Sequence, residues 1–245
     1  MSYSFVKYIS KPIHDNERGF TLIELLVAIT MFGVVAAMVY GTLNAVLSKT
    51  NIIATASDNF EMAKTCMERM SLDLAGIYVE PFPLYSKPGL TDPPDPYRVE
   101  SKIEFVGGSR FSTLRFASTE HLKIGNFPDS RLAEIRYYVT SSDDPDQGFV
   151  LRRADTAFPY GIDPNAQKSD NDPVLCANIT ALDFTFFKAD GNSEQSWDSD
   201  SEMYGLSTPV AVEIHLEIGS ENTTRSFYTR VELPVFRLPP SKGNK

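Results

Sequence analysis

A long apolar run near the N-terminus is the strongest feature of the hydrophobic pattern. Residues 20–48 contain one charged side chain, that of Glu24. The stretch FTLIELLVAITMFGVVAAMV at residues 20–39 meets the length of about 20 apolar residues that a membrane-spanning helix needs. At about 1.5 Å per residue, a helix of residues 20–48 measures roughly 43 Å, which exceeds a hydrocarbon core of about 30 Å. We therefore predict a transmembrane helix at residues 20–48.

The helical pattern continues beyond this run. Residues 49–74 contain neither proline nor glycine, whereas prolines follow at positions 81, 83 and 88. Apolar residues recur in steps of three and four, which predicts one buried helical stripe: Phe60, Ala63, Met67, Met70 and Leu74. We expect the helix to continue over residues 49–76, ending near Gly76, and its stripe to pack on a sheet of the same chain. A stripe rich in methionine also suits a promiscuous binding surface, which is the alternative.

Residues 77–245 show the alternation of apolar and polar residues that is typical of antiparallel strands. No helical pattern separates these segments, so a βαβ arrangement is disfavoured. The predicted class is α+β, with one long N-terminal helix followed by about seven strands, at 103–106, 113–117, 135–139, 149–152, 182–186, 210–218 and 227–233. Long polar loops are expected between them, at 81–97, 141–147, 155–172 and 189–205.

The charges that flank the apolar run predict its orientation. Lys7, Lys11 and Arg18 precede it against two acids, giving residues 1–19 a net charge of +1, whereas the sequence after Lys49 turns acidic. By the positive-inside rule the N-terminus lies in the cytoplasm and the C-terminal domain lies outside. A secretory signal peptide fits poorly, because the apolar run is too long and no small-x-small cleavage site follows it closely. Any processing point is therefore expected before the run.

The junction at residues 17–28, ERGFTLIELLVA, resembles the type IV prepilin signal. The resemblance implies that a dedicated peptidase cuts between Gly19 and Phe20, removes residues 1–19 as a leader peptide, and N-methylates Phe20. It also implies that Glu24 pairs with the N-terminal amine of an adjacent subunit during assembly. A carboxylate within a membrane span is costly and marks a functional position by default. Because its own helix dipole compensates little of that cost, a partner cation is the better physical explanation of Glu24.

Several later segments resemble the J-type minor pseudopilin of bacterial type II secretion systems. They are MERMSLDL at 67–74, GFVLRR at 148–153, the strand pattern at 174–187 followed by Trp197, and PVAVEI at 209–214. Their order and spacing carry the resemblance, and the segments 81–96 and 155–172 depart from it.

The resemblance implies a domain order of leader (1–19), transmembrane and filament-core helix (20–48), periplasmic helix continuation (49–76) and periplasmic β-rich domain (77–245). It implies a single-pass inner-membrane protein that joins a periplasmic pseudopilus. Its expected partners are I- and K-type minor pseudopilins, the major pseudopilin, the prepilin peptidase/N-methyltransferase and membrane lipid. The expected role is to prime assembly at the pseudopilus tip for export of folded proteins across the outer membrane, without catalysis. Alternatives are a minor pilin of a type IV pilus, for adhesion or twitching, and an enzyme or sugar-binding domain on a pilin-type anchor.

Composition narrows the chemistry further. The 245 residues carry a net charge of −9, which becomes −10 once the leader is removed and disfavours nucleic-acid binding. Three separated histidines (His14, His121 and His215) offer little for a metal or acid–base centre, and no nucleophile or phosphate-binding motif is present. We expect His14 to leave with the leader, His121 to lie in a turn and His215 on the polar side of a strand. Cys66 and Cys176 form either a disulfide or two buried thiols in an oxidising compartment.

The loop at 189–205 is rich in oxygen ligands that suit Ca²⁺, including Asp190, Asp198, Asp200 and Glu202. Its spacing does not fit an EF-hand. A solvated surface loop without cofactor is therefore the favoured interpretation, and calcium is the alternative. Trp197, the single tryptophan, is expected to be a packing anchor rather than a ligand platform.

Overall fold

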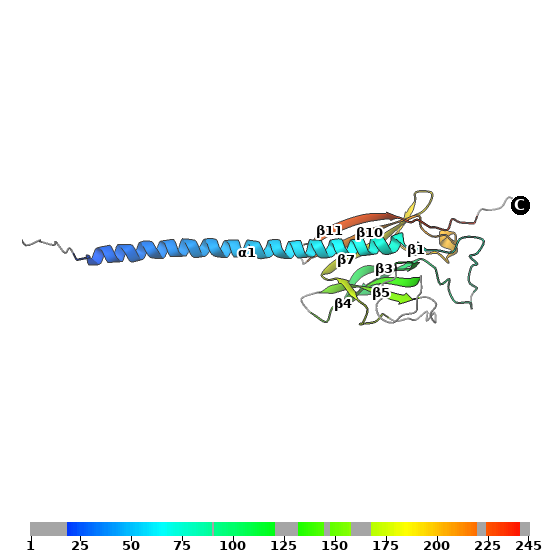
Figure 1. Cartoon of the computed structure of the whole chain (residues 1–245), viewed down its shortest axis with the longest axis horizontal. Helices are drawn as coiled ribbons and strands as arrows, with labels where there is room; N and C mark the ends of the chain where they lie inside the picture. Colours follow the sequence, from blue (N-terminus) through cyan, green and yellow to red (C-terminus); the bar gives the residue numbers. More distant parts are fainter. Residues whose placement is uncertain are drawn as a thin grey trace, which may run out of the picture. The chain divides into compact units, whose positions relative to one another are not determined.

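The computed structural model describes residues 19–89, 91–120, 132–144, 148–157, 168–219 and 224–240, with the backbone alone for residues 46–58. The chain divides into two compact units, residues 1–54 and residues 55–245. Helix α1 (Leu22–Ala75) begins in the first unit and ends in the second (Figure 1). His14 and His121 lie outside the described residues.

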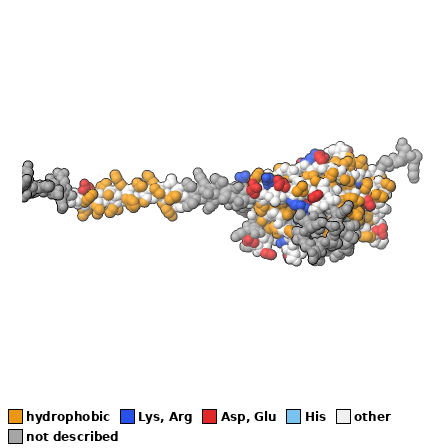
Figure 2. Space-filling model, viewed as in Figure 1, with side chains coloured by type: hydrophobic (Ala, Val, Ile, Leu, Met, Phe, Trp, Pro, Cys, Tyr) orange, Lys and Arg blue, Asp and Glu red, His pale blue; other side chains and the backbone are white. Residues whose placement is uncertain are grey.

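In the first unit, α1 is apolar and long enough to cross a membrane over Leu22–Ala45. None of these side chains is buried by the chain itself, and Figure 2 shows hydrophobic side chains covering this segment. A helix that is apolar all round needs an apolar environment, either lipid or neighbouring helices. The observation agrees with the expected membrane anchor, whose residues 20–21 precede the helix outside regular secondary structure.

The second unit contains two antiparallel sheets. The seven-stranded sheet has the order β6-β5-β4-β3-β2-β9, with β1 also paired to β3. Its strands are β1 (Ile77–Tyr78), β2 (Glu100–Val106), β3 (Ser109–Ser118), β4 (Ala133–Ser141), β5 (Phe149–Ala157), β6 (Val174–Cys176) and β9 (Trp197–Asp198). The four-stranded sheet has the order β11-β10-β7-β8. Its strands are β7 (Ile179–Phe187), β8 (Ser193–Glu194), β10 (Ala211–Ile218) and β11 (Arg225–Glu232).

The predicted α+β class is confirmed. Each of the seven predicted strands corresponds to a strand of seven residues or more, and the additional strands β1, β6, β8 and β9 have two or three residues each. Strands this short carry too few alternating positions to be read from a sequence pattern. They pair with the long strands, and β6, β8 and β9 lie at sheet edges.

Two loop predictions are wrong in part. The loop predicted at 155–172 begins too early, because β5 continues to Ala157; residues 158–167 lie outside the described residues. The segment 189–205 is not a solvated loop, because it contains β8, β9 and the 3₁₀ helix η2 (Glu202–Tyr204). Its Trp197 and Ser199 are buried. Acidic residues made the segment look solvated, but their neighbours in the sequence pack inward.

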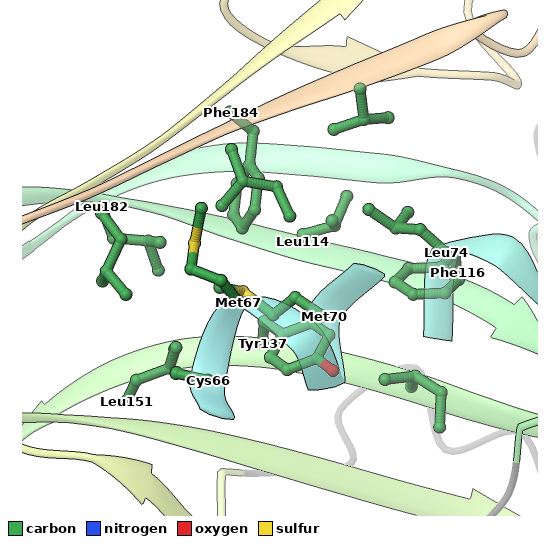
Figure 3. Close-up of a cluster of buried hydrophobic side chains, with 14 of the residues drawn as sticks. Cys66, Met67, Met70, Leu74, Leu114, Phe116, Tyr137, Leu151, Leu182 and Phe184 are labelled. Carbon is green, nitrogen blue, oxygen red and sulfur yellow. The ribbon is translucent and has the colours of Figure 1, made fainter. Parts of the chain in front are cut away.

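The core of the second unit lies around the last turns of α1. Ala63, Met67, Met70 and Leu74 are buried as predicted, whereas Phe60 at the start of the stripe is exposed. Strands of both sheets supply the opposing side chains, including Leu114, Phe116, Tyr137, Leu151, Leu182 and Phe184 (Figure 3). The helical stripe therefore packs on the sheets of its own chain, and the methionines are core residues.

Cys66 of α1 and Cys176 of β6 form a disulfide, with 6.2 Å between their Cα atoms. Both residues are buried, and β6 is an edge strand of the seven-stranded sheet. Of the two alternatives left by the sequence, the structure therefore has the disulfide rather than two free thiols. It joins helix and sheet across 110 residues of sequence.

Candidate processing and assembly site

Gly19 and Phe20 form an exposed, non-helical segment immediately before α1. The ring of Phe20 is 90% exposed. A peptidase needs an accessible backbone outside regular secondary structure, and this junction is non-helical and exposed. The structure therefore places the predicted scissile bond at the boundary between non-helical chain and apolar helix.

Thr21 and Glu24 cap the N-terminus of α1. The Glu24 Oε2 atom accepts hydrogen bonds from the Thr21 backbone N–H at 3.0 Å and from the Thr21 hydroxyl at 2.9 Å. The Glu24 N–H in turn donates to the Thr21 hydroxyl at 3.3 Å. This reciprocal arrangement is a capping box, in which an N-cap threonine and a glutamate three residues later satisfy free helix-end donors. The pattern Thr-x-x-Glu is visible in the sequence, but its capping role was not among our predictions.

The cap leaves room for the predicted assembly role of Glu24. Both capping bonds end on the same oxygen, Oε2, and the side chain is exposed. A carboxylate has several lone-pair positions and accepts more than two hydrogen bonds. Glu24 is therefore able to hold the helix end and to pair with an external cation in the same geometry.

A buried electrostatic cluster in the second unit surrounds Asp73, in the last turn of α1. Its fully buried carboxylate receives Arg153 Nε at 2.7 Å and Arg153 Nη2 at 3.2 Å. The hydroxyl of Tyr137 and the guanidinium of Arg69 also donate to it. Burial, together with the Asp73 charge, raises the pKa of Tyr137 well above its ordinary value, so the phenol stays a donor.

Sequence reasoning did not find this cluster. It did, however, single out both contributing segments, residues 67–74 and 148–153, as similar to the J-type pattern. The structure brings the two segments together. Arg153 forms ion pairs with Asp73 of α1, at 2.7 Å, and with Asp155 of its own strand, β5, at 2.6 Å. Burial alone would lower the pKa of Arg153, but the two carboxylates outweigh it and raise the pKa. The cluster joins the end of the helix to the centre of the large sheet.

A second buried arginine, Arg237, ties the C-terminal segment into the second unit. Its guanidinium donates to Asp95 at 3.3 Å and to the carbonyls of Ser199 and Leu206 at 2.9 and 2.7 Å. It also stacks on the ring of Tyr85, 3.3 Å from the centroid. The proline-rich segment 81–96 and the acidic segment 189–205 are therefore joined through one side chain.

The acids proposed for calcium have protein partners in the structure. Glu194 pairs with Lys188 at 2.7 Å and Glu202 pairs with Lys87 at 2.6 Å. Asp200 accepts the hydroxyl of Tyr85 at 3.0 Å. Within the described part of the chain, no group of three or more His, Cys, Asp or Glu residues is arranged to hold a metal ion. Asp200 and Glu202 therefore join this segment to the proline-rich segment 81–96.

Two further residues singled out in the sequence, Trp197 and His215, pack against neighbouring side chains or backbone. Trp197 is buried and its Nε1 donates to the carbonyl of Ser207 at 3.0 Å, as a packing anchor does. His215 lies on the polar side of β10, as predicted. Rather than being fully solvated, it stacks on Tyr228 with 4.3 Å between ring centroids. Its ring nitrogens lie 3.7 and 3.3 Å from Asp183 and Glu217.

Two known protein families match parts of this chain. Residues 14–40 match the prokaryotic N-terminal methylation motif, which covers the Gly19–Phe20 junction and the Thr21–Glu24 cap. Residues 41–229 match type II secretion system (T2SS), protein J, which covers the Asp73–Arg153 cluster, the disulfide and nearly all strands. A comparison with individual curated proteins finds no match. The chain therefore belongs to the type II secretion system (T2SS) protein J family, the J-type minor pseudopilins.

Proposed function

We propose that this minor pseudopilin is a subunit of the pseudopilus tip complex, where it assembles with I- and K-type minor pseudopilins and primes addition of the major pseudopilin. The pseudopilus in turn supports export of folded proteins across the outer membrane. The observation that carries the proposal is the continuity of an exposed Gly19–Phe20 junction with a capped apolar helix bearing one carboxylate, Glu24. The chain acts as a structural subunit and not as an enzyme.

Processing is the first step of the proposed function. The prepilin peptidase cleaves between Gly19 and Phe20 on the cytoplasmic side and methylates the new amine of Phe20. Cleavage one residue before the Thr21 cap leaves the capping box in place, since both of its partners remain in the mature chain. A methylated amine retains its positive charge and is therefore available to a carboxylate.

Assembly is the second step. While the subunit stays in the inner membrane, the Glu24 carboxylate lies within an apolar segment at a large free-energy cost. Pairing with the N-terminal amine of a neighbouring subunit neutralises both charges, which favours transfer from the bilayer into the filament. The exposed apolar side chains of Leu22–Ala45 then pack against other helices.

The C-terminal domain is proposed to lie in the periplasm. The Cys66–Cys176 disulfide supports this location, because disulfides form and persist in oxidising compartments. The charge bias across the apolar run predicts the same orientation. In this arrangement the disulfide forms after the domain has crossed the membrane.

The experiment that tests the proposal replaces Glu24 with valine in a strain lacking the natural gene. E24V is expected to be cleaved and inserted normally but to lose co-purification with the I- and K-type partners and to lose exoprotein release. Glu61→Val, which removes an exposed acid from a later turn of α1, is the matched control and is expected to retain both. Normal incorporation of E24V would contradict the assembly role.

Priming is tested separately by deleting the gene and counting pseudopili. A priming subunit predicts fewer pseudopili of ordinary length, because initiation is impaired and elongation is not. Shorter pseudopili in ordinary number would argue against priming. A type IV pilus role predicts loss of twitching with normal exoprotein release, so assaying both distinguishes it.

A further inference from the structure

The solvent-facing side of the seven-stranded sheet carries a cluster of cationic side chains, which we call the cationic sheet face. It consists of Arg98 before β2, Lys102 of β2, Arg115 of β3, Arg136 of β4 and Lys168 after β5. These residues line a hollow of about 160 Å³. The opposite side of the same strands faces the core, where Leu114, Ile135 and Tyr137 are buried.

Strand register brings the positive charges together. Arg115 of β3 pairs directly with Arg136 of β4 and, on its other side, with Glu100 of β2. Like charges opposite one another destabilise a sheet. Glu134 offsets this by accepting Arg115 Nη2 at 2.6 Å and Arg136 Nη2 at 2.8 Å. The guanidinium groups are thereby held in fixed positions.

The cations of the cluster outnumber the carboxylates among the described residues around the hollow. Glu100 receives Arg98 at 2.7 Å and Lys102 at 2.6 Å, and Lys168 pairs with Glu104. Among the described residues that line the hollow, five cations face two glutamates, Glu100 and Glu104. Glu134 adds a carboxylate beside it, and Asp198 of β9 lies opposite Glu100 in the sheet. Cations still outnumber acids among these described residues, in a chain whose net charge is −9. Burial alone would raise the pKa of Glu100, but the surrounding cations outweigh it and lower the pKa.

The arginines of the cluster are held in ordered positions. The side chains of Arg115, Arg98 and Arg136 are 9%, 17% and 21% exposed, so their rotamers are restricted before any partner binds. The buried Nε of Arg98 has no hydrogen-bond partner among the described residues. Pre-ordered groups lose less conformational entropy on binding, and guanidinium groups match carboxylates in a bidentate geometry.

We propose that the cationic sheet face is a docking surface for an acidic segment of a protein partner, whose aspartate or glutamate carboxylates enter the hollow. The sheet itself contains carboxylates bound in this way, because Glu100 and Glu134 already accept hydrogen bonds from arginine guanidinium groups of the face. The embedded glutamates oppose a dense polyphosphate, which favours isolated carboxylates over nucleic acid. The surface is independent of the Gly19–Phe20 junction and of Glu24, so the inference stands or falls separately from the assembly role.

The test uses the mature full-length protein in detergent and a fluorescently labelled hexaglutamate peptide as the probe. Lys102 and Lys168 are the more exposed cations of the face, at 64% and 38%, so the double variant K102A/K168A leaves the arginine network in place. The matched control is K64A/R230A, which removes two exposed cations from α1 and β11. Equal unfolding midpoints establish that both variants are folded.

The natural protein and the K64A/R230A control are expected to bind hexaglutamate equally, and K102A/K168A at least tenfold more weakly. Binding is expected to weaken as salt rises from about 50 to 300 mM, since exposed charges are screened. Equal binding by both double variants, or equal binding of hexaglutamate and hexaglutamine, would overturn the proposal. Tighter binding of inorganic phosphate than of hexaglutamate would overturn the choice of partner. Processing and membrane insertion remain normal in every variant if only the docking surface is affected.

Discussion

The carboxylate of Asp73, in the last turn of α1, forms a buried ion pair with the guanidinium of Arg153 on β5, with 2.7 Å between Oδ2 and Nε. Tyr137 and Arg69 also donate to the Asp73 carboxylate, and Asp155 accepts a further hydrogen bond from Arg153. A buried pair of this kind stabilises a fold only when both partners and their remaining hydrogen bonds are present. The pair therefore determines how the end of the helix sits on the sheet.

Replacing Arg153 with methionine is expected to lower the free energy of unfolding by about 3–5 kcal/mol, because it leaves a buried carboxylate without its main partner. Urea titration followed by the fluorescence of buried Trp197 measures the change. The double variant D73L/R153M removes both charges and is expected to recover much of the loss. Lys64→Met breaks only an exposed i,i+4 pair and should cost less than about 0.5 kcal/mol. A double variant as unstable as R153M would contradict the ion-pair explanation.

Removing the disulfide with C66A/C176A is expected to lower the free energy of unfolding by about 4–5 kcal/mol, because a cross-link over a loop near 110 residues restricts the unfolded chain. Thiol alkylation after denaturation without reductant should label neither cysteine in the natural protein. Dithiothreitol should destabilise the natural protein and leave C66A/C176A unchanged. Two alkylated cysteines in protein taken from the periplasm would show that the bond is absent there.

Separating the two roles of Glu24 requires a change at Thr21. Thr21→Ala removes the hydroxyl of the capping box and should cost the helix about 1 kcal/mol. Because Glu24 is retained, T21A is expected to assemble with its partners, whereas E24V is not. Co-purification from membranes measures the difference. If T21A and E24V lost assembly to the same extent, helix capping alone would explain the requirement for Glu24.

Acid is expected to destabilise the second unit partly through Glu100. Its pKa in the folded protein lies below the ordinary value of 4.5. The stabilisation is therefore fully present above about pH 4.5 and is lost as pH falls through the folded pKa. Glu100→Gln should be less stable than the natural protein at pH 7, and the difference should shrink below pH 4. Urea titrations at pH 7, 5 and 3.5 test this; a constant difference at all three would contradict it.

Arg237 lies close to the C-terminus, yet its replacement is expected to be severe. Arg237→Met leaves the buried carboxylate of Asp95 without its ion-pair partner, at a cost of about 3 kcal/mol or more. It also frees the proline-rich segment 81–96, so limited proteolysis is expected to cut there first. Arg230→Met, which breaks an exposed pair on β11, is the control and should retain the natural pattern. Equal proteolysis of R237M and R230M would argue against the tie.

Local patterns were sufficient for the helix, the long strands and the N-terminal methylation motif. A long apolar run with one carboxylate indicates a membrane-spanning helix, and period-two alternation indicates which residues of a strand share a face. The Thr21–Glu24 cap could also have been predicted from a local pattern, since its two residues are three positions apart in the sequence. The family resemblance rested on segments of this kind, and the match over residues 41–229 confirms it.

The sequence by itself determined the long helix and the seven long strands, and that the chain carries a prepilin-type N-terminus. Only the tertiary structure decided that Asp73 meets Arg153 across 80 residues, Cys66 meets Cys176 across 110, and Arg237 meets Asp95 across 142. It also decided that Arg115 and Arg136 share one row of the sheet. The physical reason is that alternation assigns a residue to a face but not to a partner. Partners depend on strand order and register, which long-range packing sets.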